Sequence, residues 1–467
     1  MTIRNLDRLL APAAVAVVGG GPTADGPDAA VIHNLTNGGF AGPVMPVHPQ
    51  RQAVQGVLAY RDIAALPVTP DLAVIARPLG EAPGLIRELG ERGCRAVVLL
   101  TDEVLDDAGP GQAILDAARP FLLRVLGPDG LGLAVPGHGL NASVGNTPLL
   151  AGRIGFVSES AAILRAAADW AGRHHIGFSH LLSVGAKLDV DLGDLLDYLA
   201  RDSHAKAIFL YLETVRHARK FMSAARAAAR IKPVIVLKPR NCHADPEDDP
   251  VYDAAFRRAG LLRVEAIEEL FSAMETLATA RPVAGSRLAI VGNSRSIGLL
   301  AGDSLSRAGG TLAQLAPATR DGLAGLVPAG FAADNPLALG VHAGPGDYAR
   351  ALDLLARDSG ADGVLVVHAP TAADNDSRCA QAVAEHAGQR AVFTAWLGGN
   401  LTEPARRLFK ERRVPGYSSP DAAVAAFMTL ACHHHNQQLL LQTPPSVPEA
   451  FTPDAAAARR IVQAALA

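Results

Sequence analysis

The sequence predicts an α/β fold of three successive domains, and three similar segments carry this prediction. In each segment an apolar strand runs directly into a turn of small residues: Ala14–Gly21, Arg153–Ser160 and Arg287–Ser294. The segments begin roughly 135 residues apart, which is about the length of one domain. Strands that alternate with amphipathic stretches predict parallel sheets. A buried strand, a small turn and a helix start direct free backbone N–H groups at one point, which suits a phosphate or carboxylate.

Composition narrows the class of protein. The 467 residues are 49% hydrophobic and 19% charged, so the chain can bury several cores. The net charge of −3 argues against nucleic acid as the main partner, because nucleic acid is bound by basic faces. The N-terminus lacks the apolar core of a signal peptide, and we predict no membrane span. Four cysteines (Cys94, Cys242, Cys379 and Cys432) show no CxxC spacing, which indicates free thiols in the cytoplasm.

The first domain, residues 1–140, reads as alternating strands and helices. Its predicted strands are Val15–Val18, Val44–Val47, Leu72–Ala76, Ala96–Leu100 and Val125–Gly127. In parallel sheets, ligands lie beyond the carboxyl ends of the strands. The residues at these ends are Gly19, Gly20, Gly21 and Pro22 after the first strand, His48 and Pro49 after the second, and Arg77 and Pro78 after the third. We expect them to converge on one crevice.

The second domain is predicted over residues 151–282 and the third over residues 286–445, with a C-terminal tail at 446–467. Strands are expected at Phe209–Glu213 and Val234–Lys238 in the second domain, and at Leu288–Val291, Gly363–His368 and Ala391–Trp396 in the third. Helices are expected at Ala218–Arg230 and Ala266–Ala280. The acidic stretch Asn241–Pro250 is predicted to be a loop.

The first crevice favours a phosphorylated nucleotide other than NAD. GGGP is not GxGxxG, and no acidic residue ends the second strand to hold a ribose. Arg77 supplies a cation for phosphate. The alternative is that these glycines and prolines only shape turns.

Six segments follow one another along the chain: LDRLLAPAAVAVVGGGP, NGGFAGPVMPVHP, DLAVIARP, IGFSHLLSVGAKLDVD, KPVIVLK and VYDAAFRRAG. In this order they resemble NDP-forming acyl-CoA synthetases, which include the α subunit of ADP-forming acetate–CoA ligase. ARPVAGSRLAI and ARRLFKERRVPGYSSPDAAVAAFM most resemble the synthetase-like N-terminal region of long bacterial protein-lysine acetyltransferases. The resemblance implies a CoA-binding Rossmann-like domain followed by two flavodoxin-like domains of the succinyl-CoA synthetase type. It also implies CoA or acyl-CoA as cofactor and no metal site.

The resemblance further implies a catalytic histidine, which in the family carries a phosphoryl group on a loop that reads SHTG. Here the loop reads RNCHADPEDDP, so His243 is the candidate carrier and Glu213 the glutamate that orients it. The carboxylates that follow His243 would repel a phosphate. A solvated loop histidine is therefore the alternative for His243, and packing is the alternative for Glu213.

The sequence departs from the family mostly at the second and third turns, whereas the first crevice is better kept but not intact. The family SQSGA, whose helix start grips the phosphoryl group, is Ser158-Glu159-Ser160-Ala161 here, and Ser158 and Ser160 remain the predicted ligand-binding residues. Glu159 either places a carboxylate in this site, caps the helix or points into solvent. The third turn reads Asn293-Ser294-Arg295-Ser296-Ile297-Gly298 where the family has NAGGPG. Asp28 and Asp129 add negative charge near the first crevice.

Two functions are consistent with these observations. The main hypothesis is a CoA- or acyl-CoA-binding regulatory or sensing module that has lost phosphohistidine catalysis. The alternative is an enzyme, the α subunit of an NDP-forming acyl-CoA synthetase. The chain stops where the ATP-grasp region of the family begins, so we expect an ATP-grasp subunit or an acetyltransferase as partner. We also expect a homo-oligomer, and neither a nucleic acid nor a membrane as partner.

Overall fold

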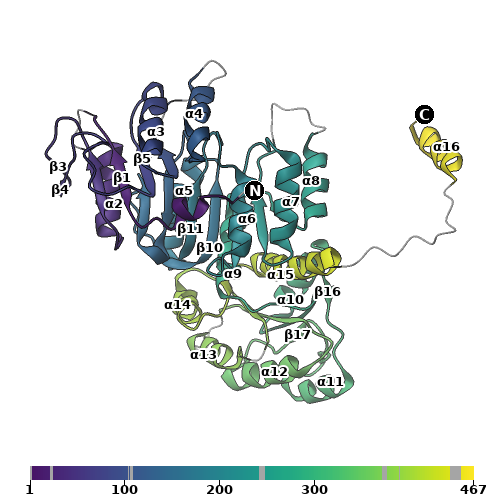
Figure 1. Cartoon of the computed structure of the whole chain (residues 1–467). Helices are drawn as coiled ribbons and strands as arrows, with labels where there is room; N and C mark the ends of the chain where they lie inside the picture. Colours follow the sequence, from purple (N-terminus) through teal and green to yellow (C-terminus); the bar gives the residue numbers. More distant parts are fainter. Residues whose placement is uncertain are drawn as a thin grey trace.

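The computed structural model describes residues 3–21, 25–101, 103, 105, 109–240, 248–370, 376–388, 390–441 and 454–466. Three sheets with helices on their faces make up the body of the molecule (Figure 1). The first domain lies at the upper left of this view, the second beside it and the third below. Helix α16 (Ala455–Leu466) lies apart from the three domains. The predicted α/β fold is thereby confirmed.

The first sheet has the order β2-β1-β5-β6-β7, and all its strand pairs are parallel. Each strand is a short apolar run that the sheet buries on both faces, as expected where helices cover a parallel sheet. The elements are β1 (Val15–Val18), β2 (Val44–Val47), β5 (Leu72–Ile75), β6 (Ala96–Leu99), β7 (Arg124–Leu126), α1 (Leu6–Leu10), α2 (Pro27–Asn37), α3 (Ala82–Glu91) and α4 (Gly111–Ala118). A separate hairpin joins β3 (Ala53–Val54) to β4 (Val57–Leu58).

The second sheet has the order β14-β13-β12-β10-β11-β8-β9. Its elements are β8 (Gly132–Val135), β9 (Leu140–Ser143), β10 (Ala151–Ser158), β11 (Phe178–Ser183), β12 (Ala207–Tyr211), β13 (Val234–Leu237), β14 (Leu262–Val264), α5 (Ala161–Arg173), α6 (Leu192–Arg201), α7 (Ala218–Ala229), α8 (Asp248–Ala259) and α9 (Ile267–Thr279). The pairs from β14 to β11 are parallel, whereas β8 and β9 join antiparallel at the edge. β8 therefore belongs to the second sheet, although its residues fall within the range predicted for the first domain.

The third sheet has the order β16-β15-β18-β19-β20, with β17 also paired to β15. Its elements are β15 (Arg287–Gly292), β16 (Thr311–Leu312), β17 (Leu337–Ala338), β18 (Gly363–His368), β19 (Val392–Trp396), β20 (Gly416–Tyr417), α10 (Arg295–Arg307), α11 (Pro317–Leu323), α12 (Pro345–Arg357), α13 (Asp376–His386), α14 (Glu403–Glu411) and α15 (Pro420–Leu441). In the first two sheets, the first parallel strand along the chain lies between the second and the third, and in the third sheet β15 lies between β16 and β18. The strand order reverses at this strand, and ligands bind at such a switch point in open α/β sheets.

Shared cores join the domains. One cluster of buried side chains contains Leu9 and Leu126 of the first domain together with Leu133 and Val157 of the second sheet. The third domain is tied to the second through α9, where the hydroxyls of Thr276 and Tyr417 lie 2.8 Å apart. Within the described ranges, we find no helix that has both the length and the apolar surface required to cross a membrane.

Candidate active site at the junction of the first two domains

The glycine turn after β1 is open enough for a ligand to approach its backbone. Gly20 has a φ of 146°, a region that side-chain-bearing residues rarely adopt, and a Cβ built on Gly21 would meet nothing within 4 Å. The turn lies at the switch point of the first sheet, because β1 pairs with both β2 and β5. Of the predicted residues in this turn, Pro22 lies outside the described residues. Gly21 is thus the open part of the turn at the first crevice, whereas Gly19 and Gly20 have side chains packed against them.

Arg77 follows β5 and reaches across to the same turn. A Cβ on Gly20 would fall 1.9 Å from the Arg77 Nη1, so the guanidinium lies directly over this glycine. Arg77 Nε and Nη2 also donate to Glu81 Oε2 at 2.9 and 2.5 Å. The side chain of Arg77 is 25% exposed, and the neighbouring Pro78 is exposed. The structure therefore brings Arg77 and the glycine turn together, as the sequence predicted.

Asp28 places a carboxylate behind the glycine turn. It lies in the first turn of α2 and is 4% exposed. A Cβ on Gly19 would fall 2.0 Å from its Oδ2, so the carboxylate packs against this glycine. A helix start favours negative charge, which stabilises Asp28 here. A phosphate bound at the same turn has to tolerate this neighbouring charge.

His48 does not present its ring to the crevice as a free ligand. It is 3% exposed, and its Nδ1 accepts hydrogen bonds from the backbone N–H groups of Gln50 and Arg51 at 3.2 and 3.1 Å. Its Nε2 is buried and has no hydrogen-bond partner among the residues that the structure describes. His48 thus shapes the turn after β2, whereas the adjacent Pro49 is exposed at the rim.

In the turn after β10, the two predicted serines have different roles. Ser158 is fully buried, and its hydroxyl donates to the Ser160 carbonyl at 2.7 Å and accepts from the Ser160 N–H at 3.1 Å. Ser160 caps α5 by accepting the Ile163 N–H at 3.3 Å. Ser158 therefore stabilises the turn and offers no accessible hydroxyl to a ligand, whereas Ser160 lines a pocket.

This pocket, which we call the junction pocket, has a volume of about 360 Å³ and lies at the switch point of the second sheet. Glu159 and Lys187 face each other in its wall, with 2.6 Å between Oε2 and Nζ, and each side chain is 6% exposed. Glu159 is thus an ion-paired carboxylate and does not point into solvent. The lining residues are Asp129, Glu159, Ser160, Ala161, Gly185, Ala186, Lys187, Glu213, Thr214 and Arg216.

Asp129 connects the junction pocket to the first crevice, because it follows β7 at the carboxyl edge of the first sheet. The two domains touch closely there: a Cβ on Gly185 would fall 2.0 Å from the Pro128 carbonyl oxygen. Three strand spacings separate β1 from β7, a distance of roughly 14 Å. A ligand that lies along this edge can therefore extend from the glycine turn to the junction pocket.

Glu213, the second predicted catalytic residue, lies in the junction pocket and is exposed. Its Oε1 accepts a hydrogen bond from the Tyr211 hydroxyl at 3.3 Å. Burial, followed by the charge of Glu213, raises the pKa of Tyr211 to about 12, so that this hydroxyl remains a donor at neutral pH. His243 lies outside the described residues, so its distance from Glu213 is untested.

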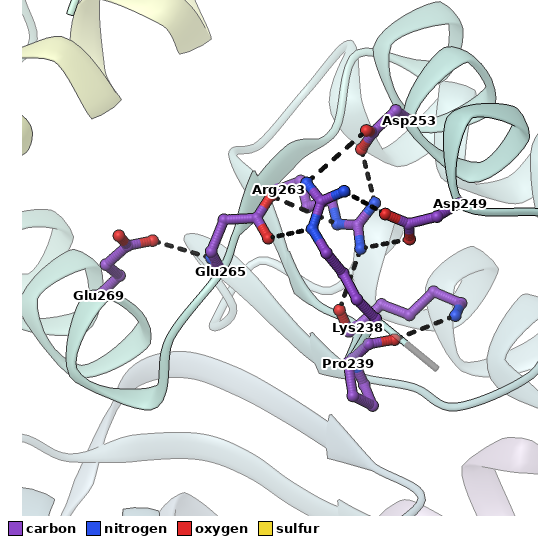
Figure 2. Close-up of polar contacts among 8 residues, drawn as sticks. Lys238, Pro239, Asp249, Asp253, Arg263, Glu265 and Glu269 are labelled. Atoms are coloured by element: carbon purple, nitrogen blue, oxygen red, sulfur yellow. Dashed lines mark hydrogen bonds and ion pairs between the residues drawn. The ribbon is translucent and has the colours of Figure 1, made fainter. Parts of the chain in front are cut away.

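An ion-pair cluster holds the two chain segments that flank residues 241–247. Arg263 on β14 donates to Asp253 Oδ1 at 2.6 Å and to Asp249 Oδ1 at 2.8 Å, both on α8 (Figure 2). The same guanidinium donates to the Lys238 carbonyl at 3.2 Å, just after β13. These contacts fix the start of α8 beside the end of β13. The pKa of Asp249 is lowered, chiefly by its hydrogen bond from Arg263.

The third turn is closed by its own side chains. Asn293 is 3% exposed, and its side-chain amide forms hydrogen bonds with both the N–H and the carbonyl of Ala369 across the switch point.

A larger hollow of about 600 Å³ near the start of β7 contains none of the predicted residues, and Arg124 pairs there with Asp189 and Asp194. In the described part of the chain, no cluster of side chains is suited to a metal ion.

The sequence interpretation did not include Lys187, Thr214 and Arg216 among the site residues. Lys187 could have been found from the sequence, because it is a single charged residue in the run of small residues after β11. This run lies at the carboxyl edge of the sheet, where ligands bind. Thr214 and Arg216 follow Glu213 in the loop after β12. The glycine turn and Arg77 are suited to a phosphorylated ligand, whereas the negative charge of Asp28 repels its phosphates.

Comparisons with known proteins agree with this geometry. A model of CoA-binding domains matches residues 13–136, and a model of succinyl-CoA ligase-like flavodoxin domains matches residues 151–277. The chain is 30% identical to acetate–CoA ligase [ADP-forming] I of Archaeoglobus fulgidus over 440 residues, which are 91% of this chain and 63% of that protein. It is 29% identical to the α subunit of acetate–CoA ligase [ADP-forming] II of Pyrococcus furiosus, over 90% of this chain and 96% of that subunit.

The fold is also that of a solved structure. The apo form of a dinucleotide-forming acetyl-coenzyme A synthetase 1 from Ca. Korarchaeum cryptofilum superimposes with a TM-score of 0.87, at 24% identity. The match covers 94% of this chain and 100% of that chain. Three domains of this chain thus share one arrangement with that structure.

Proposed function

Because this chain is a member of the superfamily of NDP-forming acyl-CoA synthetases, we propose that it is the CoA-binding, α-type component of an acid–CoA ligase. The reaction is acyl-CoA + phosphate + NDP ⇌ acid + CoA + NTP. The Pyrococcus relative supports this proposal, since it is an α subunit that the chain matches over nearly its whole length. The relatives thus favour the enzyme over the regulatory module that the sequence interpretation ranked first.

The observation that carries the proposal is the continuous edge from the glycine turn to the junction pocket. When CoA is bound, its phosphates would lie at Gly19–Gly21 near Arg77, and its thiol end would reach Asp129 and the junction pocket. When bound, CoA would supply the thiol that the acyl group leaves in the forward reaction and rejoins in the reverse reaction. Ser160 at the start of α5 and Glu213 would then flank the reacting carbonyl.

A second candidate function is a CoA- or acyl-CoA-binding regulatory module without phosphoryl transfer. The acidic stretch after His243 favours it, because the carboxylates there would repel a phosphoryl group on that histidine. Such a module acts through a partner, either an acetyltransferase or a second copy of this chain. The ligase instead requires an ATP-grasp subunit, in the cytoplasm, where acyl-CoA and nucleotides are available.

One experiment separates the two functions. The purified chain is incubated with acetyl-CoA and radiolabelled phosphate, and both free CoA thiol and acid-labile protein-bound phosphate are measured. The ligase component gives stoichiometric label that is lost in His243→Ala. The regulatory module gives no label but still binds acetyl-CoA in calorimetry. Absence of both label and binding would contradict both functions.

A further inference from the structure

The Glu159–Lys187 pair holds two consecutive residues, Glu213 and Thr214, in the loop after β12. Glu159 Oε2 accepts the N–H of Glu213 at 3.1 Å and the N–H of Thr214 at 3.4 Å. Lys187 Nζ donates to the carbonyl and the hydroxyl oxygen of Thr214 at 3.1 and 3.2 Å. Glu159 Oε2 therefore binds the two N–H groups of this segment, and Lys187 Nζ binds the two oxygens of Thr214. Oε2 and Nζ are themselves 2.6 Å apart.

The backbone at Lys187 points to a specific role for this side chain. Lys187 has a φ of 54°, which is uncommon and costly for a residue with a Cβ. Its N–H donates to Val184, and Ala186 donates to the Pro128 carbonyl, so the first domain supports this conformation. A long, charged side chain is therefore held in a strained turn and buried beneath the pocket, where solvation does not stabilise it.

The carboxylate of Glu213 is left available by this arrangement. In the described part of the chain, its contact with the Tyr211 hydroxyl is the one hydrogen bond that the structure gives it. Its backbone is fixed by Glu159, whereas its side chain is exposed to the pocket. The position of this carboxylate relative to Ser160 and Arg216 thus depends on the buried pair.

We infer that Glu159 and Lys187 are positioning residues for Glu213, and that they act as an internal ion pair that fixes the backbone of residues 213 and 214 at the wall of the junction pocket. The importance of Glu213 to catalysis rests on the proposed function. The anchoring of the loop rests on the contacts alone. The two parts are therefore tested by different measurements.

The test compares Lys187→Met with Lys232→Met. Lys232 is a matched control, since it is also buried, and its ammonium also donates to backbone carbonyls, those of Leu199 and Asp202. Arg216 and His217 are exposed in the anchored loop, and trypsin cuts between them when the loop opens. Mass spectrometry then gives the cleavage rate after Arg216 under native conditions.

We expect Lys187→Met to raise this cleavage rate by about tenfold or more, and Lys232→Met to leave it within about twofold of the wild type. The double variant Glu159→Gln/Lys187→Met leaves no unpaired buried charge, so it serves if the single variant does not fold. Equal cleavage in Lys187→Met, the double variant and Lys232→Met would overturn the inference.

A second readout uses the release of CoA from acetyl-CoA and phosphate. Lys187→Met is expected to lower the single-turnover rate of CoA release by about tenfold, shift its pH profile and leave the acetyl-CoA concentration for half-maximal rate unchanged, because Glu213 is misplaced while CoA still binds. Lys232→Met is expected to change neither quantity. An equal loss of activity in Lys187→Met and Lys232→Met would mean that the Glu159–Lys187 pair has only a structural role. If the wild type releases no CoA, the proposed function fails, whereas the cleavage assay still decides the anchoring.

Discussion

The guanidinium of Arg77 lies over Gly20, with its Nη1 1.9 Å from the point where a Cβ would be. Because Gly20 has no side chain, the cation and the backbone of the turn lie close together. Charged side chain and backbone N–H groups are the two elements that bind phosphate at such turns. This relationship links the fold of the first domain to the binding of CoA.

Replacement of Arg77 by glutamine is expected to weaken CoA binding by about tenfold, because one charge-assisted contact to phosphate is lost. The salt dependence of the affinity should also become shallower. Titration calorimetry at low and moderate salt measures both effects. Arg87→Gln, an exposed arginine on α3, is the control. Equal affinities for Arg77→Gln and Arg87→Gln would show that Arg77 serves only its pair with Glu81.

Replacement of Asp28 by asparagine is expected to strengthen CoA binding by about fivefold, because the repulsion between its carboxylate and the phosphates is removed. The same change costs about 0.5 kcal/mol of stability, since a negative charge at the α2 start is lost. Calorimetry and thermal unfolding measure the two effects. Weaker CoA binding in Asp28→Asn would mean that the carboxylate contacts the ligand through a donor group.

The buried pair predicts a non-additive loss of stability. Lys187→Met alone should reduce the free energy of unfolding by about 3 kcal/mol, because Glu159 is left buried without its partner. Glu159→Gln/Lys187→Met should lose less than the sum of the two single changes. Urea unfolding of Glu159→Gln, Lys187→Met and the double variant, beside the wild type, gives the double-mutant cycle. Strict additivity would indicate that the two side chains do not interact.

Stability is expected to fall as the pH drops from about 6.5 to about 4. Burial lowers the pKa of His180 to about 4, although the nearby Asp202 carboxylate opposes this shift. Between the two values the unfolded chain binds more protons than the folded chain, so stability rises with pH. The full contribution of His180 is about 3 kcal/mol. His180→Gln should flatten the profile measured by unfolding, whereas His204→Gln, at an exposed ring near the same carboxylate, should not.

The strands were predictable because their signal is local. Val15–Val18, Val44–Val47 and Gly363–His368 appear with the predicted bounds, since short apolar runs between small-residue turns specify buried parallel strands. β8 and β9 were not assigned to the second sheet. The antiparallel pairing of β8 with β11, which also brings β9 to this sheet, is a long-range contact that no sequence pattern in the first domain indicates.

The candidate site was predictable at the edge of the sheets but not in its contacts. The carboxyl ends of β1 and β5 had to meet, so Gly20 and Arg77 were expected together. The partner of Glu159 was not predictable, because Lys187 lies on the next loop and reaches it through a left-handed backbone turn. The burial of Ser158 and His48 likewise depends on how the turns fold back on their own side chains.

The most direct test of the account is a titration of the purified chain with CoA and with acetyl-CoA, beside the variant Gly20→Val. A Cβ at Gly20 would clash with the Arg77 guanidinium, and the φ of 146° disfavours any branched residue. The account predicts heat from one saturable site per chain in the wild type and its loss in Gly20→Val. An absence of heat with both ligands in the wild type, or equal binding in Gly20→Val, would contradict it.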